Sequence, residues 1–134
     1  MTVLDFVQRR LGTVITSAGG IGGECVDLAN QFLADMYGDP HEYLNAVDWA
    51  GARVPGHAWI ANTPSNMPRQ GDLVVWGYSS AAGTGPNGHI ALALAASQMW
   101  VVSCDQNWPT GSPVRLMLHS YAGILGWQSY TGRH

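Results

Sequence analysis

Lysine is absent from this sequence, and only 11% of its 134 residues are charged. Without lysine the chain cannot form a Schiff base, and it cannot supply the Gly-Lys-Ser/Thr segment of a phosphate-binding P-loop. Its six basic residues are scattered arginines, and the formal net charge is −3. The chain therefore has no basic stripe for nucleic acid and no basic surface for an anionic membrane.

Long apolar runs are also missing. The N-terminal segment MTVLDFVQRRLG carries polar side chains at intervals and has no stretch long enough for a signal peptide or a membrane helix. We therefore expect synthesis in the cytoplasm without a signal peptide. Cysteine is scarce as well: one disulfide between Cys25 and Cys104 is conceivable, but a domain of this length does not require it. We expect both thiols to be free.

Glycine and tryptophan, in contrast, are plentiful, with 17 and six residues. This composition favours a β-rich core with many turns and an aromatic-lined groove. The chain has no internal repeat or linker, and its length suits one domain over residues 1–134 with a single core.

Residues 25–37, which follow a glycine-rich segment, have the pattern of an amphipathic helix that ends at Gly38. Cys25 stands in the first turn, where free backbone N–H groups and the helix dipole lower the pKa of a thiol. The alternative is a small buried apolar residue, the usual role of a free cysteine. The apolar face of this helix holds Leu28, Phe32, Leu33 and Met36, and the polar face holds Asp27, Asn30, Gln31 and Asp35.

Two phosphate-binding alternatives fail on single residues. A dinucleotide-binding fingerprint needs a glycine where Cys25 stands. A phosphatase loop of cysteine, five residues and arginine fails because Gln31 occupies the arginine position. The glycine-rich segment therefore serves the cysteine and not a phosphate group.

Local signals predict the remaining elements. Thr2 and Asp5 form an N-cap pattern for a short first helix that ends at Gly12. Residues 41–50 predict another short helix, and residues 51–69, which include three prolines, predict a long irregular connection packed down through Trp59. The expected apolar face of the first helix comprises Val3, Leu4, Val7 and Leu11. Strands are expected at residues 73–76, 89–95, 100–108, 114–118 and 124–130.

Side-chain alternation in two of these strands brings polar groups together. In residues 89–95, His89 shares a face with two alanines, and these small residues leave room for the helix that bears Cys25. In residues 100–108, Asp105 and Asn107 share one face, whereas Cys104 points the other way as a core thiol.

A cysteine, a histidine, an acid and an amide in this arrangement are the parts of a thiol hydrolase. His89 would take the thiol proton of Cys25 and later return it to the leaving amine. Asp105 would hold the imidazole in the required tautomer, and Asn107 would support this network. The backbone N–H of Cys25 is the natural first donor to an oxyanion.

These segments resemble, in order and wording, those of CHAP domains (cysteine, histidine-dependent amidohydrolases/peptidases) over nearly the whole chain. The matching segments are GECVDL at 23–28, GDLVVW at 71–76, GHIA at 88–91, DQNW at 105–108 and LGW at 125–127. The resemblance implies an α+β, papain-like fold with N-terminal helices packed on an antiparallel β-sheet.

It also implies cleavage of an amide bond in bacterial peptidoglycan, as an N-acetylmuramoyl-L-alanine amidase or a peptide endopeptidase. Such domains occur in phage lysins, virion-associated lysins and bacterial autolysins. We therefore expect action on the bacterial cell wall, delivered by a phage, either alone or within a larger lysin or virion assembly.

The sequence departs from the commoner family pattern at three places. Glu24 stands where glutamine is frequent, and an ionised carboxylate cannot donate to an oxyanion, so the second oxyanion donor stays open. Asp105 stands where glutamate is common. Some members bind calcium through aspartates before the cysteine, but here that segment reads SAGGIGG and has no carboxylate before Glu24. Glu24 and Trp108 are expected to contact substrate.

No metal or cofactor is expected elsewhere, because the remaining histidines form no close-spaced ligand pairs with either cysteine. These histidines are His41, His57, His119 and His134, and the tryptophans expected to serve packing are Trp49, Trp76, Trp100 and Trp127.

Two alternative functions stay open. Related papain-like cell-wall peptidases use a second histidine as third member, but none lies near Asp105 in the sequence. A non-catalytic, tryptophan-lined module would instead bind cell-wall glycan or peptide.

Chelation tests the metal-free expectation. Because the segment before Glu24 offers no carboxylate ligand, a calcium chelator should leave both the melting temperature and the activity unchanged. Thermal unfolding with and without chelator measures this. A clear drop in melting temperature that calcium restores would contradict the expectation.

Overall fold

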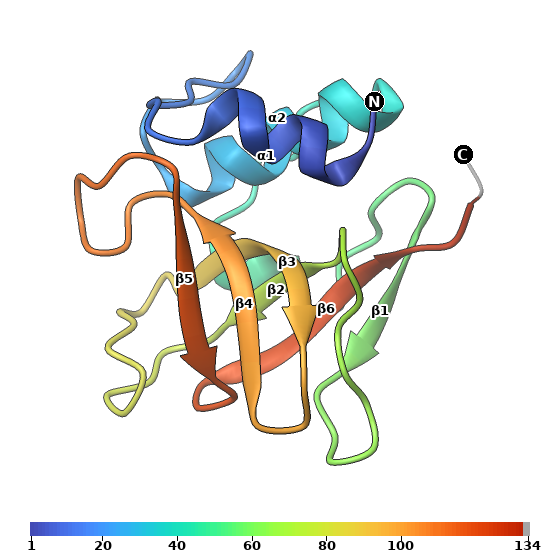
Figure 1. The fold of residues 1–134 in the computed structure, drawn as a ribbon, viewed down its shortest axis with the longest axis vertical. Coiled ribbons are helices and arrows are strands. Elements are labelled where there is room, and N and C mark those ends of the chain that lie inside the picture. Colours follow the sequence, from blue (N-terminus) through green and yellow to red (C-terminus); the bar gives the residue numbers. More distant parts are fainter. Residues whose placement is uncertain (133–134) are drawn as a thin grey trace.

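The computed structural model describes residues 1–132, which form two α-helices, one 3₁₀ helix and a six-stranded antiparallel sheet. The helices α1 and α2 lie together over one side of the curved sheet (Figure 1), which confirms the expected α+β architecture. The helices are α1 (Val3–Arg10), α2 (Cys25–Tyr37) and η1 (Ala46–Trp49). The strands are β1 (His57–Ala61), β2 (Leu73–Trp76), β3 (His89–Ala96), β4 (Trp100–Asp105), β5 (Arg115–Ser120) and β6 (Ile124–Tyr130).

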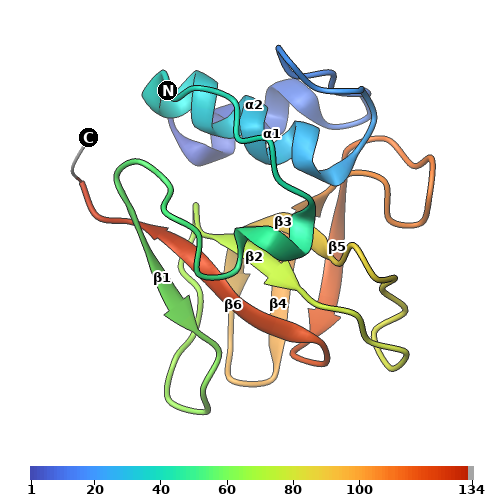
Figure 2. The same cartoon turned by 180° about the vertical axis from the view of Figure 1, so that it is seen from behind.

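The strand order is β1-β6-β2-β3-β4-β5, so β1 and β5 form the two edges. Strands β2, β3, β4 and β5 are consecutive neighbours, and each pair is antiparallel. Trp76 lies opposite His89, and Val101 lies opposite His119. The short helix η1 lies beside β2 and β3 in the view from behind (Figure 2).

An apolar cluster covers each face of the sheet, because alternate residues of β2, β3 and β4 point to opposite sides. Helix α2 packs on the side of Ile90, Leu92 and Cys104, whereas Ala91 and Ala93 belong to the other cluster. The expectation that the helix covers the alanine face is therefore wrong. The larger side chains supply more apolar area against the helix.

Helix α1 begins as predicted but buries different residues. The Thr2 hydroxyl accepts a hydrogen bond from the Asp5 N–H at 3.1 Å, and the Asp5 carboxylate accepts one from the Thr2 N–H at 2.9 Å. Phe6 and Val7 are buried, whereas Leu4 and Leu11 are 48% and 42% exposed. The Phe6 ring packs against the Phe32 ring of α2, with the two ring centroids 5.3 Å apart, so the face of α1 that holds Phe6 is the buried one.

The predicted boundaries hold for α2, β2 and β6, are shifted by one or two residues for β3 and β5, and fail in the segments described next. Strand β1 lies inside the supposedly irregular segment 51–69 and pairs with β6. Within residues 41–50 only η1 is helical. Strand β4 ends at Asp105 instead of 108, because Asn107 has a left-handed φ of 66° that turns the chain away from the sheet.

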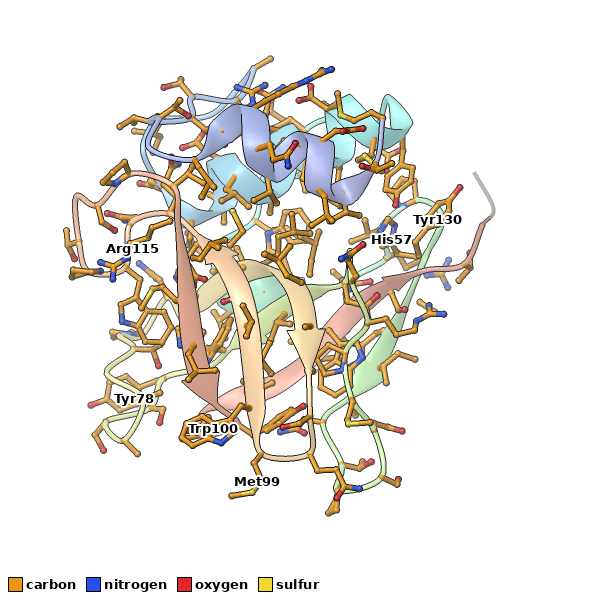
Figure 3. The ribbon with its side chains drawn as sticks, in the orientation of Figure 1. His57, Tyr78, Met99, Trp100, Arg115 and Tyr130 are labelled. Carbon is orange, nitrogen blue, oxygen red and sulfur yellow. The ribbon has the colours of Figure 1, made fainter. Side chains whose placement is uncertain are left out.

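Trp49, Trp76 and Trp127 are fully buried, as expected, but Trp100 is 47% exposed and its packing role was wrongly predicted. Figure 3 shows Trp100 at the rim of the molecule beside Met99, at the tight turn between β3 and β4. His134 lies outside the described residues. Within residues 1–132, no helix has the length and apolarity that a membrane crossing needs.

Candidate active site

Cys25 is the first residue of α2, and Asp27 fixes the glycine-rich loop before it. The buried Asp27 carboxylate accepts hydrogen bonds from the N–H groups of Ser17, Gly22 and Glu24, at 3.1, 2.9 and 3.1 Å. Gly20 passes so close that a Cβ atom there would lie 1.8 Å from the Asp27 carboxylate. The sequence placed Asp27 on the polar face of the helix, yet the side chain is fully buried, because the loop folds over this carboxylate.

Gln106 ties the same loop to the sheet. Its fully buried amide accepts a hydrogen bond from the Ile15 N–H at 2.7 Å and donates to the carbonyls of Ile15 and Glu24, at 3.1 and 2.8 Å. Gln106 follows Asp105 directly in the chain. The end of β4 therefore fixes the backbone immediately before Cys25.

His89 begins β3 and is 5% exposed. Its Nε2 lies 2.8 Å from Oδ2 of Asp105. Gly88 before it has a φ of 69°, and a Cβ there would lie 2.1 Å from the Trp76 carbonyl oxygen, so only glycine fits. The predicted pairing of His89 with Asp105 is present in the structure.

Asp105 is fully buried and accepts from three side chains. Its Oδ2 contacts Nε2 of His89 and also Nε2 of His119, at 2.8 and 3.0 Å, and its Oδ1 accepts from the Ser103 hydroxyl. Burial alone would raise the pKa of Asp105, but the hydrogen bonds from His119 and His89 outweigh it and lower the pKa to about 2. The carboxylate is ionised, so both histidines carry a hydrogen on Nε2.

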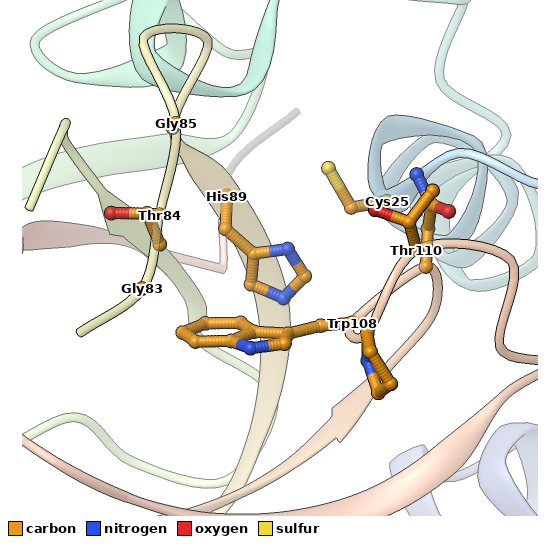
Figure 4. A pocket seen from close by; sticks show the side chains of 10 residues that line it. Cys25, Gly83, Thr84, Gly85, His89, Trp108 and Thr110 are labelled. Carbon is orange, nitrogen blue, oxygen red and sulfur yellow. The ribbon is translucent and has the colours of Figure 1, made fainter. Parts of the chain in front are cut away.

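Since Nε2 of His89 donates to Asp105, its Nδ1 is left as the acceptor in the neutral ring. Cys25 and His89 line one cavity of about 330 Å³. Figure 4 shows the thiol and the imidazole turned toward it from opposite sides. The lining residues are Cys25, Gly83, Thr84, Gly85, Gly88, His89, Asn107, Trp108, Pro109 and Thr110.

The thiol of Cys25 does not have the lowered pKa that its helical position suggested. Burial raises the pKa of Cys25, and hydrogen bonds from the backbone N–H groups of Ile90 and Val26 offset only part of this effect. Cys104 is deeper, and burial followed by the charge of Asp105 raises its pKa to about 12. Both cysteines are free thiols.

The other predicted site residues have mixed positions. Trp108 lines the cavity, and its ring centroid lies 4.5 Å from that of His89. Asn107 also lines the cavity, but its side-chain oxygen accepts from the Gly111 N–H at 2.7 Å and so braces the loop after β4. Glu24 lines a neighbouring hollow together with Glu42 and Asp48.

Sequence reasoning missed His119 and the positioning role of Gln106. His119 reaches Asp105 only through the pairing of β4 with β5, and no local pattern of residues predicts that pairing. The statement that no histidine lies near Asp105 is thus wrong in space. In the described part of the chain, no group of three or more histidine, cysteine, aspartate and glutamate side chains is arranged to hold a metal ion.

Comparisons with known proteins identify one family model and several solved structures with the same fold. The model of the CHAP domain matches residues 15–107. The crystal structure of the wild-type endolysin LysIME-EF1 is 28% identical, with a TM-score of 0.78 over 94% of this chain and 61% of that one. Ly7917 is 17% identical, with a TM-score of 0.73 over 97% of this chain, and shares the fold. This chain spans about three fifths of both structures, 61% of each.

The two thiols should differ sharply in reactivity. We predict that iodoacetamide at about pH 8 modifies only Cys25 in the folded protein, because Cys104 is covered and has a pKa of about 12. Denaturation without reductant should release two reactive thiols. Mass spectrometry of the alkylated peptides measures both results. Modification of Cys104 in the folded state, or fewer than two thiols after denaturation, would contradict this prediction.

Proposed function

Because this chain belongs to the CHAP family, we propose that it is a peptidoglycan hydrolase that cleaves an amide bond with Cys25 as nucleophile. The observation that carries this proposal is the His89–Asp105 pair, because His89 lines the same cavity as Cys25. The cleaved bond is the one that an N-acetylmuramoyl-L-alanine amidase or a peptide endopeptidase hydrolyses.

In the proposed reaction, Nδ1 of His89 takes the proton from Sγ of Cys25, and the sulfur attacks the carbonyl carbon of the amide. The backbone N–H of Cys25 donates to the oxyanion that forms. The intermediate collapses to a thioester as His89 protonates the leaving amine. Water, deprotonated by His89, then attacks the thioester and releases the carboxylic acid and the free thiol.

Asp105 stabilises the positive charge that His89 carries during these steps. The carboxylate is buried, ionised and 2.8 Å from Nε2, so it acts at short range in a medium of low dielectric constant. The Trp108 ring covers one side of this pair and lines the cavity where the substrate binds. Glu24, in the neighbouring hollow, belongs to an extension of the substrate groove.

The alternative of a non-catalytic binding module has less support. Such a module needs several tryptophans along one groove, but Trp108 is the one tryptophan among the residues that line the cavity, and Trp49, Trp76 and Trp127 are fully buried in the core. A buried, ionised acid hydrogen-bonded to a histidine beside a free thiol has no use in a binding module. The likeness to the endolysin LysIME-EF1, of which this chain spans 61%, favours action on the bacterial cell wall after phage delivery, with this domain forming part of a larger lysin or virion assembly.

Clearing of a cell-wall suspension tests the proposal. We predict that Cys25→Ala and Cys25→Ser keep the fold and lose essentially all lysis, because the nucleophile is gone. Cys104→Ala is the matched control and should retain lysis. Mass spectrometry of the released fragments identifies the bond. Lysis by Cys25→Ala at a rate near that of the wild type would end the proposal.

Asp105 and Asn107 should contribute unequally to turnover. Asp105→Asn removes the charge that offsets the imidazolium, and we predict a fall in kcat of roughly 10² to 10³. Asn107→Ala removes the hydrogen bond to Gly111 and should cost roughly tenfold, the effect of one neutral hydrogen bond. Steady-state kinetics on a soluble peptidoglycan fragment, with circular dichroism as the folding control, decides between them. A larger loss for Asn107→Ala would refute the role given to Asp105.

A further inference from the structure

His119 is a buried histidine that the proposed reaction does not use directly. It lies on the edge strand β5, and its Nε2 is 3.0 Å from Oδ2 of Asp105, the oxygen that also binds His89. Resting on the function proposed above, we propose that His119 is a positioning residue of the hydrolase. It holds the Asp105 carboxylate in the orientation that His89 requires.

The hydrogen bonds of Asp105 explain why a second histidine matters. Oδ2 of a carboxylate offers two lone pairs, and here His89 and His119 occupy one each, while Ser103 binds Oδ1. The carboxylate cannot rotate without breaking one of these bonds. His89 exchanges a proton with Cys25 in the proposed reaction. If His119 is removed, Ser103 is the one partner of Asp105 among these three that holds the carboxylate without taking part in that exchange.

Aromatic contacts hold His119 itself in place. Its ring centroid lies 4.8 Å from that of Trp76 and 4.6 Å from that of Trp108. His119 also lines a small hollow of about 160 Å³, whereas Asp105 does not line it and is fully buried. The two tryptophan rings therefore hold the imidazole with its Nε2 at Oδ2 of Asp105.

Two substitutions distinguish positioning from simple packing. His119→Gln loses the ring but keeps an N–H donor that reaches Oδ2, and His119→Phe keeps the ring between the two tryptophans but loses the donor. A positioning role predicts that the glutamine variant works better than the phenylalanine variant. A packing role predicts the reverse order. His57→Phe, on β1, is the control for replacing a histidine remote from Asp105.

The first measurement is kinetics on a soluble peptidoglycan fragment. We expect His119→Phe to lose about tenfold or more in kcat with little change in KM, and His119→Gln to stay within about threefold of the wild type. His57→Phe should match the wild type. Thermal unfolding verifies that each variant is folded.

The second measurement needs no substrate, so it separates this proposal from the peptidoglycan activity. In a Cys104→Ala background, iodoacetamide alkylates Cys25 alone, and its rate near neutral pH reports the proton transfer from Cys25 to His89. The rate should fall severalfold in His119→Phe and be restored in His119→Gln. If this pattern holds but no peptidoglycan is cleaved, the positioning role stands and the proposed substrate fails. Equal rates for the two variants, or a faster rate in His119→Phe, would overturn the positioning role.

Discussion

The buried carboxylate of Asp105 is the constraint on which the site depends. A charge inside a protein is tolerated only when hydrogen bonds replace its lost water, and Asp105 receives three from β3, β4 and β5. The donors on these three strands must therefore reach the Asp105 carboxylate when the domain folds and buries this charge. The fold therefore fixes His89 before any substrate arrives. The next residue, Gln106, holds the segment before Cys25, so two consecutive residues position both halves of the site.

The thiol illustrates a competition between burial and the helix terminus. A helix N-terminus stabilises an anion by about 0.3 to 1 kcal/mol, which is less than one pKa unit of about 1.4 kcal/mol. Burial of an ionisable group acts over several units. In Cys25 burial dominates, and the pKa of the thiol is raised. In the mechanism proposed above, the nucleophile is therefore formed by proton transfer to His89 during attack, and this step depends on the orientation of that ring by Asp105.

Local patterns in the sequence predicted the elements whose stability is local. The Thr2 cap, the helix from Cys25 and the apolar strands β2 and β6 all follow from spacing within one segment. Features that depend on distant pairing were missed. Strand β1 needs β6 to be recognised as a strand, and His119 meets Asp105 only once β4 and β5 are in register.

For two residues, the burial expected from side-chain polarity was wrong. Asp27 looked like a solvent-facing residue, but the N–H groups of the glycine-rich loop replace water around its carboxylate. Trp100 looked like a core residue, but it begins β4 directly after the turn that follows β3 and is 47% exposed. Hydrophobicity alone does not report either environment.

The choice of aspartate at position 105 also follows from this geometry. The commoner glutamate is one methylene longer, yet the Asp105 carboxylate reaches Nε2 of His89 at 2.8 Å. An aspartate has one rotatable bond fewer to fix, so less conformational entropy is lost in holding it. Its shorter reach keeps the carboxylate close to β4, where the Ser103 hydroxyl and the His119 ring on the neighbouring strand both contact it. The short acid and the second histidine therefore belong to one set of contacts around the same carboxylate.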